Sequence, residues 1–94
     1  MIKIVYRPHL QRRLRERKIP KDYPKIIYKQ SKSHYFDNET RHFVAIFKLK
    51  YAEKMRSIVA VYDIINDNIE IITIFPIEKT ELKNKIDSGR WIKR

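Results

Sequence analysis

One histidine and two arginines near the start of the chain, His9, Arg13 and Arg17, are spaced four residues apart. Residues four apart on a helix are neighbours on one face, so a helix here would align the three side chains in one polar stripe. Arginine is permanently charged and binds phosphate, and imidazole exchanges a proton near neutral pH. The spacing is typical either of a phosphate-binding face that holds one proton-transfer group or of an exposed cationic helix face.

A second group of polar residues surrounds a predicted turn over 38–41. His34 is either a second acid–base residue or an ordinary strand histidine. Asp37, directly before the turn, is typical of a turn-capping residue. Arg41 opens the next strand, and His42 is expected to be an exposed residue at the start of that strand.

Three further candidates lie in the strands that follow. Arg56 and Tyr62 are separated by an even number of residues, so they are expected to share one face of a strand. Thr73 lies in the apolar run IEIITIF, where a sheet threonine with a satisfied hydroxyl is the ordinary interpretation.

The C-terminal residues combine cations with the single tryptophan: Arg90, Trp91, Lys93 and Arg94. An aromatic ring among cations can stack on a nucleobase while the cations hold the phosphate backbone. The alternative is that Trp91 anchors a basic tail to the core. Both interpretations fit the sequence equally well.

The charge of the chain is strongly positive and unevenly placed. The 94 residues carry a formal net charge of +11. Residues 7–32 hold ten Lys and Arg against two Asp and Glu, residues 33–78 hold five against seven, and residues 79–94 hold six against two. This charge is either a solubilising surface or a binding face for a polyanion. Nucleic acid is favoured over a membrane because the basic segments lack a broad apolar face.

Composition excludes several classes of chemistry. The chain has no cysteine and one glycine, which excludes disulfides, thiolate zinc sites and glycine-rich nucleotide loops. The three histidines lack the spacing of a metal site, and the carboxylates are few, so no metal and no cofactor is expected. A nuclease of this composition would cleave RNA without metal, using the 2′-hydroxyl of the substrate as nucleophile. No apolar run is long enough for a membrane span and no signal peptide is evident, so a cytoplasmic protein is expected.

Hydrophobic periodicity predicts one α+β domain over residues 1–94. Two helices are expected first, at 8–18 and 23–30, because Leu10 and Leu14 recur at helical spacing and a proline opens each segment. Four strands joined by short turns then predict an antiparallel meander, with the two helices packed on one face. The predicted strands cover 34–37, 42–50, 56–64 and 69–75. Residues 2–6 are a short strand or an extended lead-in, and a last short helix over 78–86 precedes the basic tail.

The segment HLQRRLRERKI, residues 9–19, resembles the opening helix of a family of small bacterial and archaeal proteins. The segments HYFDNETRHFVAIF, RSIVAVYDI and IEIITIFP resemble the strands that follow in that family, with Asp37 and Thr73 at family positions. The resemblance covers residues 9–76 and leaves 77–94 as a basic extension. Two prolines after Ile19 depart from the family pattern, in which this loop runs straight into a helix.

This family is similar to the RelE-like toxins of the barnase–EndoU–colicin–RelE superfamily. The resemblance implies a RelE-like fold, with helices on a curved four-stranded antiparallel sheet. It also implies a toxin-type endoribonuclease, a hydrolase of RNA that is paired with a protein antitoxin and in some relatives acts on the ribosome. It strengthens the functional interpretation of His9, Arg13 and Arg17.

The first hypothesis is therefore a metal-independent endoribonuclease of a toxin–antitoxin pair. His9 would be the general base or acid, with His34 or Tyr62 as its counterpart, while an acidic or amphipathic antitoxin covers the basic face. The residues expected to contact phosphate or RNA are Arg12, Arg13, Arg17, Arg41, Arg56, Arg90, Trp91, Lys93 and Arg94. The second hypothesis is a basic RNA- or DNA-binding module without catalysis, which gives His9 no special role. An inactive protein of a mobile element is a third.

Overall fold

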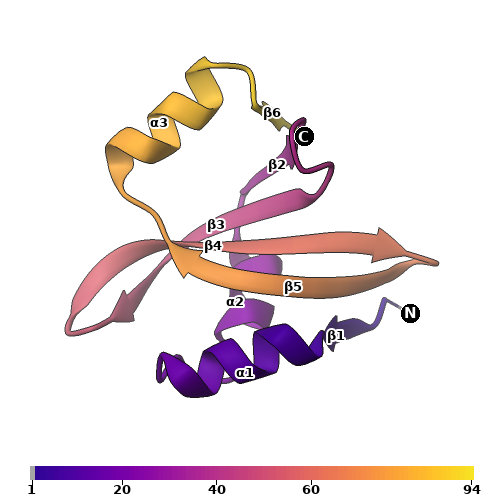
Figure 1. Cartoon of the computed structure of the whole chain (residues 1–94), viewed down its shortest axis with the longest axis vertical. Coiled ribbons are helices and arrows are strands. Elements are labelled where there is room, and N and C mark those ends of the chain that lie inside the picture. Colours follow the sequence, from indigo (N-terminus) through magenta and orange to yellow (C-terminus); the bar gives the residue numbers. More distant parts are fainter. Residues whose placement is uncertain (1) are drawn as a thin grey trace.

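The computed structural model describes residues 2–94, which form an α+β fold with three helices and one six-stranded mixed sheet (Figure 1). The sheet order is β1-β5-β4-β3-β2-β6. None of the helices in residues 2–94 is long and apolar enough to cross a membrane. The elements in chain order are β1 (Ile4–Tyr6), α1 (Pro8–Glu16), α2 (Tyr23–Gln30), β2 (Ser33–Asp37), β3 (Phe43–Tyr51), β4 (Lys54–Ile65), β5 (Asn68–Pro76), α3 (Lys79–Asp87) and β6 (Trp91–Lys93).

The predicted antiparallel meander is confirmed, and two tight turns fix its register. Tyr51 pairs with Lys54 across the turn from β3 to β4, and Ile65 pairs with Asn68 across the turn from β4 to β5. Both central residues of each turn, 52–53 and 66–67, have positive φ angles. Two-residue turns of this kind match the twist of the flanking strands.

The prediction of a four-stranded sheet followed by a basic tail is wrong, because the sheet has two further strands, one at each edge. β1 joins the sheet as a parallel neighbour of β5, with Ile4 beside Ile69. The predicted tail contains β6, which pairs with β2 and places Trp91 beside Asp37. Each added strand has three residues, too few for a period of two to be recognised, and each pairs with a partner far away in sequence.

The two N-terminal helices pack on one face of the sheet, as predicted. Leu10 and Leu14 of α1 and Ile27 of α2 are buried in one apolar cluster with Ala60 and Tyr62 of β4. α1 contacts β5, and α2 contacts β3 and β4. α1 ends two residues earlier than predicted, because Lys18 takes a left-handed conformation, with φ of 53°.

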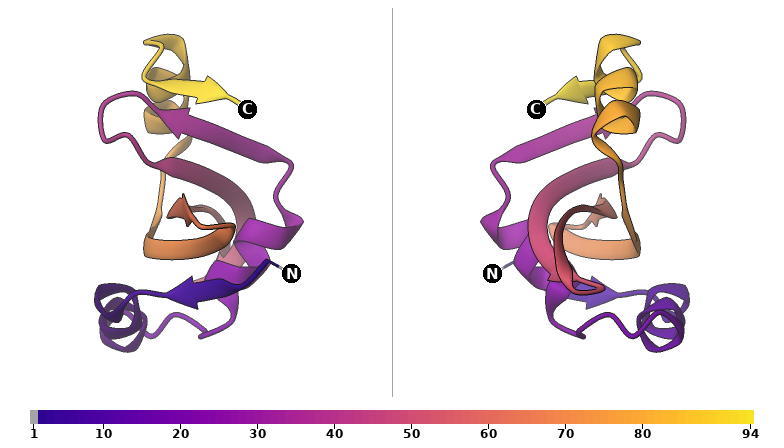
Figure 2. Two further views of the ribbon diagram at one scale, coloured as in Figure 1. Left: turned by 90° about the vertical axis from the view of Figure 1, so that its right-hand side faces the viewer. Right: turned by 90° about the vertical axis from the view of Figure 1, so that its left-hand side faces the viewer.

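The opposite face of the sheet is covered by residues 77–94, which the sequence analysis treats as a basic extension. A second apolar cluster joins Ile77, Leu82 of α3 and Trp91 of β6 to Val44 and Val59 of the central strands. Figure 2 shows α1 and α3 at opposite ends of the molecule, with the twisted sheet between them. Residues 77–94 are therefore part of the same packed domain.

A bulge in β5 changes which face its side chains present. Val61 pairs with Thr73, but the next β4 residue, Tyr62, pairs with Ile71, so Ile72 is an extra residue in β5. Simple alternation would place Thr73 on the face covered by α1 and α2. The bulge instead turns Thr73, opposite Val61, toward the α3 face.

Candidate functional site

The predicted stripe lies on α1 and brings two of its three members into contact. Nη2 of Arg13 lies 3.4 Å from Nε2 of His9. Because a guanidinium only donates, the imidazole nitrogen is the acceptor in this contact. His9 is exposed and Arg13 is half-buried, with its Nε buried and without a hydrogen-bond partner. Arg17 is exposed, and its backbone carbonyl accepts a 3.1 Å hydrogen bond from the Tyr51 hydroxyl.

The cations of this helix are not neutralised by the chain. Among residues 2–94, the arginines that form ion pairs with carboxylates are Arg7 and Arg90, and none of those on α1 does so. Arg12 is exposed beside the stripe. The guanidinium groups of α1 are therefore free of carboxylate partners within the described residues and can bind a phosphate.

The structure brings His34 and Tyr62 together, apart from the α1 stripe. Nδ1 of His34 lies 2.7 Å from the Tyr62 hydroxyl, and Nη1 of Arg94 donates to that same hydroxyl at 3.5 Å. Among residues 2–94, no hydrogen bond or aromatic contact joins His9 to either residue. α1 packs on β5. His34 lies on β2, which is three strands away from β5, or about 14 Å at the usual strand spacing.

The hydrogen bonds of Tyr62 assign the form of the His34 ring. Tyr62 is 1% exposed, so its hydroxyl hydrogen needs an acceptor within the protein. Arg94 only donates, which leaves Nδ1 of His34 as the acceptor and puts the imidazole proton on Nε2. Burial lowers the pKa of His34; hydrogen bonding to the backbone of Ser31 and Tyr28 acts in the opposite direction. Burial likewise raises the pKa of Tyr62.

These contacts give His34 a structural role. Its Nδ1 contacts the Tyr62 hydroxyl on β4, and its ring packs edge-on against the rings of Tyr28 of α2 and Tyr62. Tyr62 also stacks on Phe43, with ring centroids 5.6 Å apart. Nδ1 of the imidazole is therefore engaged inside the protein, and through these contacts His34 connects α2, β2 and β4.

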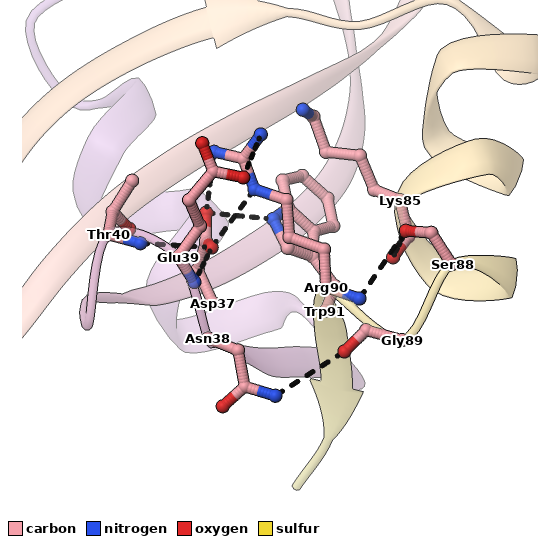
Figure 3. A network of polar contacts seen from close by, with 9 residues as sticks. All are labelled: Asp37, Asn38, Glu39, Thr40, Lys85, Ser88, Gly89, Arg90 and Trp91. Atoms are coloured by element: carbon pink, nitrogen blue, oxygen red, sulfur yellow. Dashed lines mark hydrogen bonds and ion pairs between the residues drawn. The ribbon is translucent and has the colours of Figure 1, made fainter.

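Asp37 accepts hydrogen bonds from four residues (Figure 3). Its carboxylate bonds the backbone of Glu39 and Thr40, Nε and Nη2 of Arg90, and the indole Nε1 of Trp91, at 2.9 to 3.2 Å. Burial alone would raise the pKa of Asp37, but the Arg90 guanidinium and the other donors outweigh it and hold that pKa well below its usual range. The turn-capping interpretation of Asp37 fits this geometry.

The predicted RNA-contacting residues of the C-terminal segment separate into two groups. Trp91 is 3% exposed, which leaves its ring no free face for a nucleobase, and Arg90 is paired with Asp37 and Glu39. Lys93 and Arg94 are exposed. Nζ of Lys93 lies 5.2 Å from the centre of the Tyr35 ring, and the Arg94 guanidinium lies 4.3 Å from the centre of the Phe43 ring.

Arg41 and Arg56 lie at different ends of the sheet. The Arg41 guanidinium lies 4.9 Å from the centre of the Phe36 ring. Phe36 contacts Phe43, whose ring is covered by the guanidinium of Arg94, so Arg41 and Arg94 lie on neighbouring rings. Arg56 shares the sheet face of Tyr62, but its Nε donates to the Tyr51 carbonyl at 3.0 Å, beside the β3–β4 turn. Six residues of strand, about 20 Å, separate Arg56 from Tyr62.

A polar cluster that sequence reasoning missed lies on the α3 face. Nδ1 of His42 lies 2.6 Å from a carboxylate oxygen of Asp63. Arg7, the residue before α1, donates to Asp63 at 3.4 Å and to Glu70 at 3.0 Å. Two carboxylates thus face one guanidinium, and the cluster keeps one uncompensated negative charge while His42 is neutral. The imidazole is 36% exposed, so solvent reaches it.

A cavity of about 290 Å³ adjoins this cluster between the sheet and α3. Its apolar walls include Val61, Phe75 and Trp91. Its polar lining comprises Thr40, His42 and Thr73 together with two carboxylates and two cations, those of Asp37, Glu81, Lys85 and Arg90. His42 lines the cavity, and Asp63, which His42 contacts, does not. Two larger hollows, of about 590 and 450 Å³, adjoin β1, the first against α1 and the second against the start of α2, and no histidine lines either of them. Within residues 2–94, no three His, Asp or Glu side chains are grouped closely enough to hold a metal ion.

In comparisons with known proteins, no family model matches this chain, and neither a curated protein nor a solved structure is significantly similar to it.

Proposed function

We propose that this protein is a metal-independent endoribonuclease of toxin type, in which the 2′-hydroxyl of the RNA attacks the adjacent phosphate. One observation carries the proposal: on the exposed face of α1, the His9 imidazole lies 3.4 Å from the guanidinium of Arg13. A proton acceptor and a fixed cation thus stand side by side on the helix where positive charge is densest. These are two of the groups that such a reaction needs.

The roles follow from the chemistry of each side chain. His9 accepts the proton of the 2′-hydroxyl. Arg13 binds the non-bridging oxygens of the scissile phosphate and stabilises the charge that develops on them, because a guanidinium presents several donors to phosphate. Arg12 and Arg17, which form no ion pair with a carboxylate in the described chain, hold neighbouring phosphates.

A second basic surface supports RNA as the ligand. Arg94 and Arg41 cover the rings of Phe43 and Phe36, which touch each other at 5.1 Å. The exposed guanidinium groups can neutralise phosphates, and unpaired bases can stack on a guanidinium plane. RNA offers unpaired bases and the 2′-hydroxyl together. An acidic protein segment that covers α1 would block this activity, as expected for an antitoxin.

The test is cleavage of a synthetic single-stranded RNA by the purified chain in the presence of EDTA. Wild-type protein should release fragments that end in a 2′,3′-cyclic phosphate, and a 2′-deoxy substitution at the cut position should prevent cleavage there. His9→Ala and Arg13→Ala should each lower the rate by about 10²-fold or more. Arg15→Ala is the matched control, because it removes a charge from α1 outside the stripe. Equal rates for all three variants would refute the site.

The alternative is a basic module that binds RNA or DNA without cutting it. It is favoured by the internal bonding of His34 and Tyr62, which removes the two residues expected to partner His9. Binding of the RNA without cleavage, in EDTA and with Mg²⁺, would establish this alternative.

A further inference from the structure

We propose that the outer edge of β1 binds an extended acidic segment of a partner protein, which adds to the sheet as a further strand. The inference goes beyond the proposed function, because it concerns a different side of α1 from the His9 stripe and needs no cleavage of RNA. The evidence is the unpaired backbone edge of β1, the apolar hollow beside it and the charge of the residues that line this hollow.

β1 presents an unpaired backbone edge. It is the outermost strand of the sheet, and within residues 2–94 its only strand partner is β5. The carbonyl of Lys3 and the N–H of Arg7 both form hydrogen bonds with β5, at 2.8 and 3.1 Å. Because backbone groups alternate in direction along a strand, Ile4 and Tyr6 turn their N–H and carbonyl groups away from β5. Such an edge is a template for another strand.

The Tyr6 carbonyl shows this outward direction directly. It accepts a 3.1 Å hydrogen bond from Nε2 of Gln11, an exposed residue of α1. Water or an incoming N–H can replace this exposed side-chain amide. β1 has only three residues, so backbone hydrogen bonds alone would hold a partner weakly. The side chains of the partner must therefore find contacts beside the edge.

An apolar hollow of about 590 Å³ opens along this edge. β1 lines one side of it, α1 contributes Leu14, and the segment after α1 contributes Ile19. Figure 2 shows β1 running to α1 above the segment that leads from α1 to α2. The hollow of about 450 Å³ shares Ile4, Tyr6 and Lys21 with the first, so the two are neighbours. A strand laid along β1 would direct every second side chain into these hollows.

The lining of the larger hollow is positively charged. It contains three exposed cations and no carboxylate; the cations are those of Lys3, Arg15 and Lys21. The smaller hollow adds Lys25 and one carboxylate, that of Asp22. Within residues 2–94, none of these cations forms an ion pair. Carboxylates on an added strand would therefore meet cations without partners, which favours an acidic segment over a basic one.

Two other occupants fit this edge less well. A second copy of the chain would pair β1 with β1 and bring the same cations of both copies together, which is unfavourable. Single-stranded RNA could use the cations, but it would leave the N–H and carbonyl groups of β1 without strand-like partners. An acidic peptide uses the backbone edge, the apolar walls and the charge together.

Docking at this edge leaves the His9 stripe open. Gln11 and Arg15, which are four residues apart on α1, line the hollow. Gln11 follows His9 by two positions, which is about 200° around a helix of 3.6 residues per turn. A partner in the hollow therefore contacts the side of α1 away from His9, and its binding can be measured separately from RNA cleavage.

The first test is binding of a synthetic peptide to the full chain, measured by fluorescence anisotropy. The probe is a labelled peptide of about ten residues, the length of a long strand, in which valine alternates with glutamate. It should bind, and the same peptide with lysine in place of glutamate should not. The double variant Lys3→Glu/Lys21→Glu should weaken binding of the acidic peptide by about tenfold or more. Lys83→Glu, an exposed change of the same kind on α3, is the control and should change it by less than about twofold.

The second test examines the hydrogen bonds of the edge. Only one alternating set of peptide N–H groups faces β1, so N-methylation of that set should abolish binding and N-methylation of the other set should be tolerated. In NMR measurements of hydrogen exchange, the amide of Ile4 should exchange at least about tenfold more slowly when the acidic peptide is bound.

Each contrary result is decisive. Equal effects of the two N-methylated peptides exclude strand addition. An acidic peptide that does not bind, or that leaves exchange at Ile4 unchanged, overturns the site. Protection of Ile4 that rises with protein concentration alone assigns the edge to a second copy, and protection by single-stranded RNA but not by the peptide assigns it to RNA. Absence of RNA cleavage by the wild-type protein refutes the proposed function and leaves this inference intact.

Discussion

Replacing Asp37 with alanine removes the carboxylate that joins the β2–β3 turn to β6. In the folded protein this carboxylate accepts hydrogen bonds from the backbone of two turn residues, from Arg90 and from the indole of Trp91. The Asp37 side chain is 5% exposed, while that of Arg90 is 29% exposed. The substitution therefore leaves several hydrogen-bond donors without an acceptor, and these donors differ in how well water can reach them.

The expected loss follows from where those donors lie. The turn residues Glu39 and Thr40 are exposed, so their N–H groups can bond water, and Arg90 can turn toward solvent. The indole N–H of the buried Trp91 has no such exit, and an unsatisfied buried donor costs about 1–3 kcal/mol. With the lost charge-assisted hydrogen bonds to Arg90, the free energy of unfolding should fall by about 2 kcal/mol or more.

The assay is urea denaturation followed by far-UV circular dichroism and by the fluorescence of the single tryptophan. Glu39→Ala is the matched control, because Glu39 is 70% exposed and touches the same guanidinium at 3.4 Å, so its loss should cost less than about 1 kcal/mol. An Asp37→Ala variant within 1 kcal/mol of the wild-type protein would refute the reasoning.

The same variant predicts a dependence on pH. The pKa of Asp37 is lowered in the folded state, so its contribution to stability is complete above the unfolded pKa of about 3.9. That contribution is lost as the pH falls through this value toward the lower folded pKa. The difference in unfolding free energy between wild type and Asp37→Ala should be constant from about pH 5 to 8 and should shrink below about pH 4.

Two further predictions concern the other polar contacts and the charge of α1. Tyr62→Phe keeps the aromatic packing but leaves Nδ1 of His34 without its hydroxyl partner, so the free energy of unfolding should fall by about 1–2 kcal/mol. Tyr51→Phe, which removes an exposed hydroxyl, should cost less, and equal losses in thermal or urea denaturation would contradict the structural role of His34. RNA affinity should fall steeply with salt, and Arg12→Gln should reduce the slope of log K against log salt by about 0.7. Lys83→Gln on α3, at the other end of the molecule, should leave that slope unchanged when binding is titrated by fluorescence anisotropy at several salt concentrations.

The sequence predicted the elements whose signal is local. Leu10 and Leu14 indicated α1, and the alternation in 42–50 and 56–64 indicated β3 and β4, because each pattern spans enough residues to show its period. β1 was expected only as a short strand or an extended lead-in, and β6 was expected as part of a basic tail, because three residues carry no recognisable period. Their pairing depends on β5 and β2, which are distant in the sequence.

Two details of the site depended on geometry that the residue types do not encode. The turn after β3 was expected over 52–55, but the chain turns at 52–53, although neither Ala52 nor Glu53 favours a positive φ. The shorter turn sets the register that places His42 beside Asp63. The bulge at Ile72 likewise moves Thr73 to the cavity, against the simple alternation of the strand.

The long-range pairing of the first and last strands has a consequence for the order in which the molecule assembles. The hairpins from β3 to β5 join neighbouring segments, so they close short loops and should form early. Arg7 and Glu70 are 63 residues apart, and Asp37 and Trp91 are 54 apart, so these contacts close only after the hairpins exist. The central strands would therefore fold first. Docking of β1 and α1 would follow and would bring Arg7 into contact with Asp63. In stopped-flow refolding, recovery of RNA cleavage should lag behind the formation of β-sheet.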